Sequence, residues 1–224
     1  MSEINFFPQS SRSGKERYKA SKDKKVIENI TPDYMVFGYD YFDNPGLGVG
    51  YGGYKYDGRY EETARKICKH YNLKQGDKVL EVGCAKGYML VEFYKLGLQV
   101  RGIDYSDYAV KNAHPDIRNF TKKGDISSIP FPDKEFDFVF GKEILPHVPE
   151  DKIKISIKEC MRVSKGPIFF EIQTGNTGKE LEYMVQWDRT HKILKPVSWW
   201  NSLFKELDYK GDFHYKILIP EDIK

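Results

Sequence analysis

The sequence predicts an α/β protein with a doubly wound, mostly parallel sheet and helices on both faces. Three observations support this prediction. Short apolar runs of strand length alternate with segments of helical period between residues 78 and 172, an order typical of parallel sheets. The run Lys78–Val82 leads through a glycine-containing turn into a helix, as a β-α-β unit begins. The 224 residues suit one domain with a hydrophobic core of its own.

Each element follows from a local pattern. Asp57 stands at an N-cap position before a helix in which Tyr60, Ala64, Ile67 and Tyr71 recur at helical spacing. Further helices are expected at Lys86–Leu96, Ser106–Ala113, near Asp151–Met161, before Thr190, and at Ser198–Leu207, where Trp200, Leu203, Phe204 and Leu207 face inward. Strands are expected at Lys78–Val82, Gln99–Asp104, near Asn119–Lys123, at Phe136–Phe140, Ile168–Ile172 and Phe213–Ile219.

Composition narrows the classes of protein. The three cysteines, Cys68, Cys84 and Cys160, lie far apart and form no C-x-x-C pair, which indicates reduced thiols rather than disulfides or a zinc site. No apolar run approaches the length of a membrane span or of a signal peptide. We therefore expect a cytoplasmic protein that does not enter a membrane, as a monomer or homodimer.

Charge and composition together predict three parts of the chain. The segment from Arg12 to Lys25 holds seven basic and two acidic residues, a net charge of +5, which leaves −2 of the total +3 for the rest. Residues 1–25 are expected to be a basic, flexible tail. Residues 26–60, rich in Tyr, Gly and Asp, form a separate N-terminal segment, and residues 61–224 form the sheet domain. Because the body is not basic, we expect no nucleic acid as partner.

Two glycine runs compete for the role of nucleotide loop. Gly48, Gly50 and Gly53 have the G-x-G-x-x-G spacing, but the turn signal Asn44-Pro45 precedes them in place of a buried strand. The second run, VLEVGCAKGYML, begins in a strand and ends in a helix, and the following strand VRGID ends in an acidic residue. The carboxyl ends of such strands are where these sheets bind ligands. The second run therefore contains the loop.

With these motifs the sequence resembles the class I S-adenosylmethionine-dependent methyltransferases, from about residue 57 to residue 219. VGCAKGYML and the Tyr- and Gly-rich run before the first helix look most like bacterial enzymes of surface-polysaccharide or natural-product pathways. The resemblance implies a Rossmann-like sheet whose last strand is antiparallel. It also implies S-adenosylmethionine as cofactor, S-adenosylhomocysteine as product, and a small-molecule acceptor with a reacting O, N or phosphate-like oxygen.

The resemblance also assigns cofactor-binding residues. The E-x-G-x-x-x-G loop would pass beneath the methionine and ribose, Asp104 would bind the ribose, and Tyr105 would pack on adenine. In GDISSIPF, Asp125 would contact the adenine amino group and Ile126 would cover the ring. The loop residues concerned are Glu81, Gly83, Cys84 and Gly87. Ordinary structural roles stay open: Glu81 as a strand residue, Asp104 as a helix N-cap and Asp125 as a turn residue.

Catalytic candidates follow the fourth and fifth strands. His191 is the first choice for a general base, with Asp188 as its orienting partner; a plain helix-surface pair explains this spacing equally well. Glu143 and His147 are further candidates, although the H-V-P turn around His147 favours a structural role. The His, Asp and Glu residues show no metal-ligand spacing, so no metal is expected. The aromatic residues after the fifth strand, Trp187, Trp199 and Trp200, are candidates for a pocket wall.

The first glycine run is then interpreted as a lid over the methionine end of the cofactor. Glycines allow close backbone approach, and the aromatic faces of Tyr51 and Tyr54 attract a sulfonium. Arg59 is a candidate partner for a carboxylate. A loop packed on the sheet edge is the competing interpretation. Other functions left open are an RNA or protein methyltransferase docked by the basic tail, a non-catalytic nucleotide-binding subunit, and an NAD enzyme.

Overall fold

The structure, a computed structural model, describes residues 1–7, 23, 28 and 30–217. A six-stranded sheet of order β3-β2-β1-β4-β5-β6 forms its centre. The strands are β1 (Lys78–Val82), β2 (Gln99–Asp104), β3 (Thr121–Lys123), β4 (Phe138–Lys142), β5 (Ile168–Gln173) and β6 (Asp212–Lys216). Every neighbouring pair is parallel. The predicted doubly wound α/β fold is confirmed.

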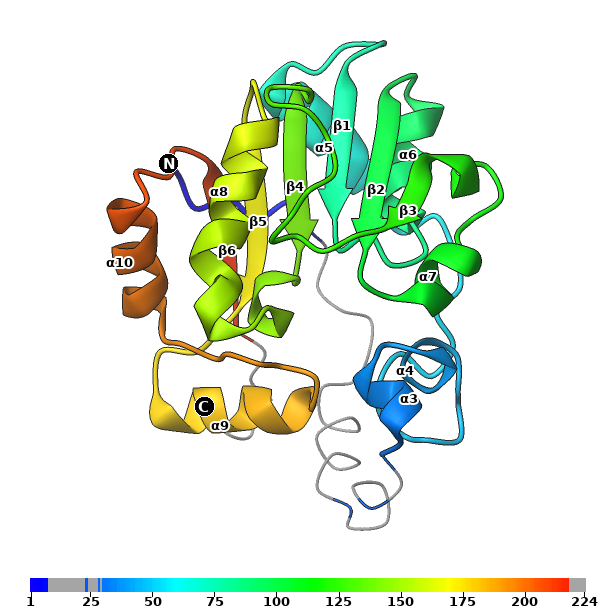
Figure 1. Cartoon of the computed structure of the whole chain (residues 1–224), viewed down its shortest axis with the longest axis vertical. Coiled ribbons are helices and arrows are strands. Elements are labelled where there is room, and N and C mark those ends of the chain that lie inside the picture. The colour runs from blue at the N-terminus through cyan, green and yellow to red at the C-terminus, as the bar shows by residue number, and fades with distance from the viewer. Residues whose placement is uncertain (8–22, 24–27, 29, 218–224) are drawn as a thin grey trace.

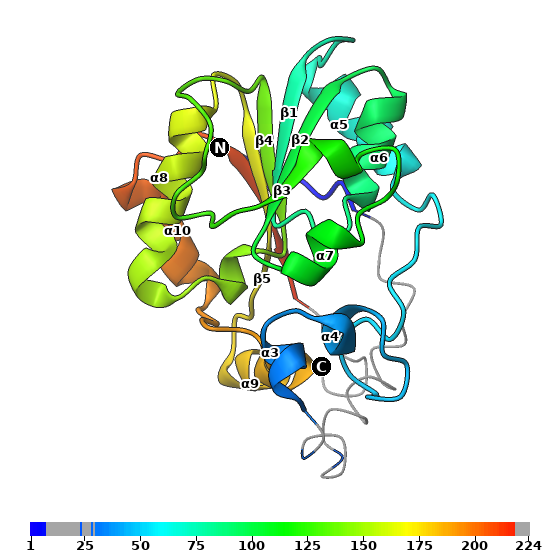
Figure 2. The same ribbon diagram turned by 45° about the vertical axis from the view of Figure 1, so that its right-hand side comes forward.

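Helices cover both faces of the sheet (Figures 1 and 2). They are α5 (Glu61–Tyr71), α6 (Tyr88–Lys95) and α7 (Asp107–Lys111), followed by α8 (Ile153–Val163) and α10 (Val197–Glu206). One core cluster joins α8 and α10 to the sheet and contains Trp200, Leu203 and Phe204, as the apolar stripe of that helix predicts. The other joins α5 and α6 to the opposite face through Ile67 and Phe93.

The last strand corrects one expectation. β6 pairs with β5 in parallel register, Phe170 opposite Phe213, where an antiparallel strand was expected. After β5 the chain passes through α9 (Gly178–Trp187) and α10 before it enters β6. This helical crossover returns the chain to the amino end of the sheet, and a strand that starts there runs parallel. β6 ends at Lys216, and residues 218 and 219 of the predicted strand lie outside the described residues.

Two element boundaries also differ from the predictions. α5 begins at Glu61 with Tyr60 as N-cap, because Asp57 instead accepts hydrogen bonds from the backbone and guanidinium of Arg59. β4 is shifted by two residues, since Phe136 forms only an isolated bridge with Ser164. The shift keeps the same side chains on each face, because side-chain direction in a strand has a period of two.

The first seven residues belong to the folded body. Phe6 and Phe7 are buried in the α5–α6 core cluster, and the Ile4 amide donates to the Phe213 carbonyl at 2.7 Å. This differs from the expectation of a flexible tail over residues 1–25, because two aromatic side chains find an apolar site at the sheet. Residues 8–22, 24 and 25 of that predicted tail lie outside the described residues.

Three helices lie beyond the carboxyl ends of the strands. α3 (Pro32–Met35) and α4 (Tyr39–Phe42) stand beside each other there, and α9 stands opposite them (Figure 1). The end of the sheet where ligands bind in such folds therefore has a roof built from the N-terminal segment and α9.

None of the described helices combines the length and apolar character needed to cross a bilayer.

Candidate functional site

A cavity of about 710 Å³ lies at the carboxyl ends of the strands, beneath α3, α4 and α9. This volume suits a small ligand. Eleven of the sequence-predicted site residues line it: Tyr51, Tyr54, Arg59, Gly83, Asp104, Tyr105, Asp125, Ile126, Glu143, His147 and Asp188. Glu81, Cys84, Gly87 and His191 do not. Of the aromatic residues proposed as a wall, Trp187 lines the cavity, whereas Trp199 and Trp200 belong to the core.

The loop after β1 makes a tight turn into α6. Gly83 and Gly87 both have left-handed backbones, with φ of 72° and 74°, a conformation that glycine adopts at little cost. A Cβ atom at Gly87 would lie 2.3 Å from Cδ1 of Ile117, so a side chain there would collide with the core. Gly87 thus shapes the turn from below, while Gly83 faces the cavity.

Asp104 ends β2 and lines the cavity. Its Oδ2 accepts a hydrogen bond from the Ala85 amide at 2.7 Å, and its Oδ1 accepts one from the Ser106 amide at 2.8 Å. Burial raises the pKa of Asp104 despite these two hydrogen bonds. The N-cap of α7 is Ser106, whose side chain accepts from the Ala109 amide. Since a carboxylate offers about four acceptor sites, Asp104 retains acceptor capacity toward the cavity.

Tyr105, Asp125 and Ile126 also line the cavity. Tyr105 is 61% exposed, and Ile126 is buried. Asp125 accepts hydrogen bonds from the amide and hydroxyl of Ser127 and pairs with Lys152, so it is a turn residue that also faces the cavity.

Glu81 and Cys84 lie behind the loop rather than in the cavity. Glu81 is buried, its Oε2 has no hydrogen-bond partner among the described residues, and burial raises its pKa. Cys84 packs in the helix layer, where a Cβ at Gly102 would lie 2.7 Å from its Sγ. Burial raises the pKa of the Cys84 thiol, which suits an inert core residue.

The first glycine run forms part of the roof. Gly50 has a φ of 68°, and a Cβ there would lie 2.4 Å from the Tyr41 carbonyl oxygen. The rings of Tyr51 and Tyr54 lie 4.4 Å apart and both line the cavity. The backbone therefore folds back tightly over α4 and presents aromatic faces to the cavity. Arg59 also lines it, bound to Asp57.

Charged side chains from β4, β5 and β6 form the floor, and sequence patterns missed most of them. Lys142 lies 2.5 Å from Glu143, and Lys216 contacts the same carboxylate. Burial favours a neutral Glu143, but the two ammonium groups outweigh it and hold its pKa well below the usual range. Gln173 donates to its other oxygen at 2.7 Å. Single lysines at strand ends carry no periodic signal. Lys142 and Lys216 come together because β4 and β6 flank β5 in the sheet.

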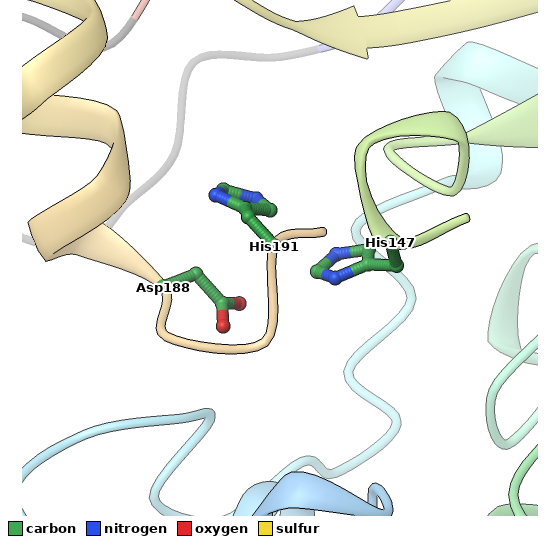
Figure 3. Close-up of side chains that lie close together, drawn as sticks. All are labelled: His147, Asp188 and His191. Carbon is green, nitrogen blue, oxygen red and sulfur yellow. The ribbon is translucent and has the colours of Figure 1, made fainter. Parts of the chain in front are cut away.

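His147, Asp188 and His191 lie close together, on the turn after β4 and the loop after α9 (Figure 3). One ligand-type atom from each lies within 4.8 Å of the others, although their sequence spacing indicated no metal site. The Asp188 carboxylate accepts from the Tyr41 hydroxyl at 2.9 Å and from the Thr190 amide and hydroxyl. A metal ion would have to displace these donors.

His191 occupies a different position from the one its role as base requires. Its Nδ1 lies 3.2 Å from the Met184 carbonyl oxygen and its Nε2 lies 2.7 Å from Oε1 of Gln173. Burial, followed by the neighbouring His147, lowers the pKa of His191 to about 4. Both ring nitrogens face protein oxygens, and the ring does not line the cavity. His147, expected to be structural, does line it.

Comparisons with known proteins agree with this architecture. Residues 80–167 match the family model described as a methyltransferase domain. The ubiquinone biosynthesis O-methyltransferase of Thiobacillus denitrificans is 32% identical over 127 residues, which are 53% of this chain and 54% of that protein. A sterol 24-C-methyltransferase of Gibberella zeae is also 32% identical over 127 residues, 52% of this chain and 33% of its own length. The chain thus spans a third to about half of these relatives.

A solved structure matches the fold directly. The YcgJ protein of Bacillus subtilis superposes with a TM-score of 0.55 and 19% identity, over 64% of this chain and 66% of that one. Residues 80–167 therefore match a methyltransferase domain, and the fold around them is the Rossmann-like fold found in class I S-adenosylmethionine-dependent methyltransferases. S-adenosylmethionine is the cofactor of that class.

Proposed function

We propose that this chain is an S-adenosylmethionine-dependent methyltransferase that methylates an oxygen or nitrogen atom of a small molecule. One observation supports this most: Asp104 ends the strand after the glycine loop and faces a roofed cavity of about 710 Å³. Gly83, Tyr105, Asp125 and Ile126 would hold the adenosine part of the cofactor. Bound there, S-adenosylmethionine supplies an activated methyl group on a sulfonium.

The methionine part of the cofactor would lie toward the charged floor and the lid. Lys142, Lys216 and Arg59 are cations that line the cavity there, and each of them suits a carboxylate. Tyr51 and Tyr54 present aromatic faces, which attract cations. The remaining space, bounded by Phe37, His147 and Trp187, would take the acceptor. Held beneath the roof, the two reactants would be aligned with each other.

The acceptor is proposed as a surface-polysaccharide or natural-product precursor. Sterols and quinones, named in the relatives' descriptions, are the alternatives, and an RNA or protein docked by residues 12–25 is the second candidate function. Incubation with methyl-labelled S-adenosylmethionine and extracts of lipids, soluble metabolites, RNA or protein separates these classes. Label in the soluble metabolites supports the first proposal, and label only in another fraction contradicts it.

Cofactor binding is tested by isothermal titration calorimetry with S-adenosylmethionine and S-adenosylhomocysteine, and with NAD as the control ligand. Binding of both methionine derivatives and not of NAD supports the proposal. If neither binds at millimolar concentration, the chain is not such an enzyme, and a binding subunit for another nucleotide becomes the better hypothesis.

A further inference from the structure

We infer that His147, not His191, accepts the proton of the methyl acceptor, and that Thr190 and Asp188 hold the His147 ring in the tautomer that this requires. The inference rests on the proposed function, because it concerns the acceptor end of the same cavity. In this methyl transfer, the acceptor lone pair forms the bond to the methyl carbon, and the electrons of the carbon–sulfur bond stay on sulfur. The acceptor's O–H or N–H proton passes to Nε2 of His147.

The position of the ring is the first support. His147 ends the 3₁₀ turn Leu145–His147 that follows β4, and it lines the cavity. Its Nδ1 lies 3.1 Å from Oγ1 of Thr190. Among the described residues its Nε2 has no hydrogen-bond partner, so this nitrogen is the one available to a ligand.

The hydroxyl of Thr190 decides which nitrogen carries the proton. Oγ1 of Thr190 lies 2.6 Å from Oδ1 of Asp188, and a hydroxyl has one proton to donate. A carboxylate only accepts, so the Thr190 proton points to Asp188. Nδ1 of His147 must then be the donor toward Thr190. In a neutral imidazole this leaves a lone pair on Nε2, which is the form that a general base needs.

The surrounding residues fix the ring in place. The edge of Phe37 contacts it with ring centroids 5.5 Å apart, and the His191 ring lies 4.8 Å away on the loop that carries Thr190. That loop is tied to the His147 turn because the Lys192 and Ile193 amides both donate to the Pro146 carbonyl. The ionisable groups around the ring are Asp104, Asp188 and His191, together with Lys152 and Lys192 in the cavity wall.

Helix α4 of the roof also contacts this group of residues. Tyr41, on α4, donates to Oδ2 of Asp188 at 2.9 Å, while Thr190 binds Oδ1. Asp188 is therefore held between the roof and the loop after α9. The carboxylate that orients Thr190, and through it His147, is thus also in contact with the roof.

Nuclear magnetic resonance tests the tautomer without an acceptor. The protein is labelled with ¹⁵N-histidine, and long-range ¹H–¹⁵N correlation spectra identify the protonated nitrogen of each ring near neutral pH. The His147 signals are assigned by their loss in His147→Gln. We expect a proton on Nδ1 and a bare Nε2. In Thr190→Val the His147 pattern should move toward the Nε2–H form, and Thr190→Ser should restore it.

Controls and outcomes keep the inference separate from the proposed function. Thr63→Val removes another buried hydroxyl, which donates to the Phe6 carbonyl and does not line the cavity, and it should leave the His147 signals unchanged. An Nε2–H tautomer in the wild type, or a pattern insensitive to Thr190→Val, overturns the inference even if S-adenosylmethionine binds. Absence of cofactor binding in calorimetry overturns the proposed function instead.

Turnover gives the second readout. With the labelled-methyl assay and the extract that accepts label, Thr190→Val should lower kcat about tenfold to hundredfold, within the contribution of a positioned base. The KM for S-adenosylmethionine should stay unchanged, because Thr190 is not assigned to the cofactor, and Thr190→Ser should recover the rate. An unchanged kcat in Thr190→Val contradicts the positioning role.

Discussion

Lys86, in the glycine loop after β1, forms an ion pair with Asp43, which follows α4 in the roof. Nζ of Lys86 lies 2.5 Å from Oδ2 of Asp43. Lys86 is buried, and it also donates to the Tyr54 carbonyl at 3.1 Å. The same Asp43 oxygen accepts from the Tyr108 hydroxyl at 2.6 Å. Burial favours a neutral Asp43, but the hydrogen bonds from Lys86 and Tyr108 outweigh it and lower its pKa. The Asp43 carboxylate thus joins the roof to the glycine loop after β1 and to α7.

The first prediction concerns this pair. Lys86→Met should lower the free energy of unfolding by about 3 kcal/mol, because it leaves a largely buried carboxylate without its cation. Asp43→Asn together with Lys86→Met should cost less than the sum of the two single changes. Urea unfolding of the four proteins measures the coupling, and Lys158→Met, at an exposed lysine on α8, is the control. Strict additivity would show that the ion pair is unimportant.

The second prediction tests the lid. Gly50→Ala should weaken S-adenosylmethionine binding at least tenfold, because the added methyl group collides with the Tyr41 carbonyl and displaces α4. Gly52 also has a positive φ, of 61°, but a Cβ there meets nothing within 4 Å. Gly52→Ala is therefore the matched control and should bind nearly as the wild type does. Equal affinity of both variants and the wild type would make the run a passive loop.

The third prediction concerns Asp104. Asp104→Asn should reduce S-adenosylmethionine affinity about tenfold to hundredfold, the effect of one or two hydrogen bonds to a charged group. The substitution should also lower the free energy of unfolding by about 1–3 kcal/mol. The amide nitrogen of the new side chain faces a backbone N–H group, which thereby loses its hydrogen-bond acceptor. Calorimetry below the melting temperature separates the two effects. Asp107→Asn, at an exposed pair with Lys123, should change neither; a similar loss there would rule out a specific role for Asp104.

The fourth prediction is a pH dependence. Burial and the neighbouring His147 lower the pKa of His191 to about 4, below the ordinary value of 6.5. The unfolded chain therefore binds this proton at higher pH than the folded one. Stability should be fully present above about pH 6.5 and fall toward pH 4, by on the order of 3 kcal/mol for this group.

His191→Gln should flatten that part of the profile, as measured by chemical denaturation at several pH values. The exposed residue His70 provides the control, since His70→Gln should leave the slope as it is in the wild type. Parallel curves for the wild type and His191→Gln between pH 4 and 6.5 would contradict the prediction.

Local patterns were enough for the secondary structure of the sheet domain. β1 and β2 begin and end at the predicted residues, because continuous apolar runs bounded by turn signals are read locally. The strand–glycine–helix order located the loop, and the acidic end of VRGID located Asp104. The direction of β6 was not accessible in this way, because a strand's direction depends on the path of the crossover before it.

The identity of the base shows the same limit. The run W-D-R-T-H gave His191 and Asp188 as a pair by spacing, yet the fold turns His191 toward Gln173 and joins Asp188 to His147 through Thr190. Thr190 and His147, for example, lie 43 residues apart in the sequence. No local pattern encodes them, because each residue has an ordinary structural role in its own segment.

The sequence by itself determined the order of strands and helices in the sheet domain, the glycine turn between β1 and α6, and the acidic residue that ends β2. All of these depend on side-chain period and on neighbours within a few residues. The tertiary structure alone decided the all-parallel sheet and the contacts of Lys142 and Lys216 with Glu143. It also decided the ion pair between Lys86 and Asp43, and that His147 lines the cavity whereas His191 does not. Each of these depends on which distant segments burial and hydrogen bonding bring into contact.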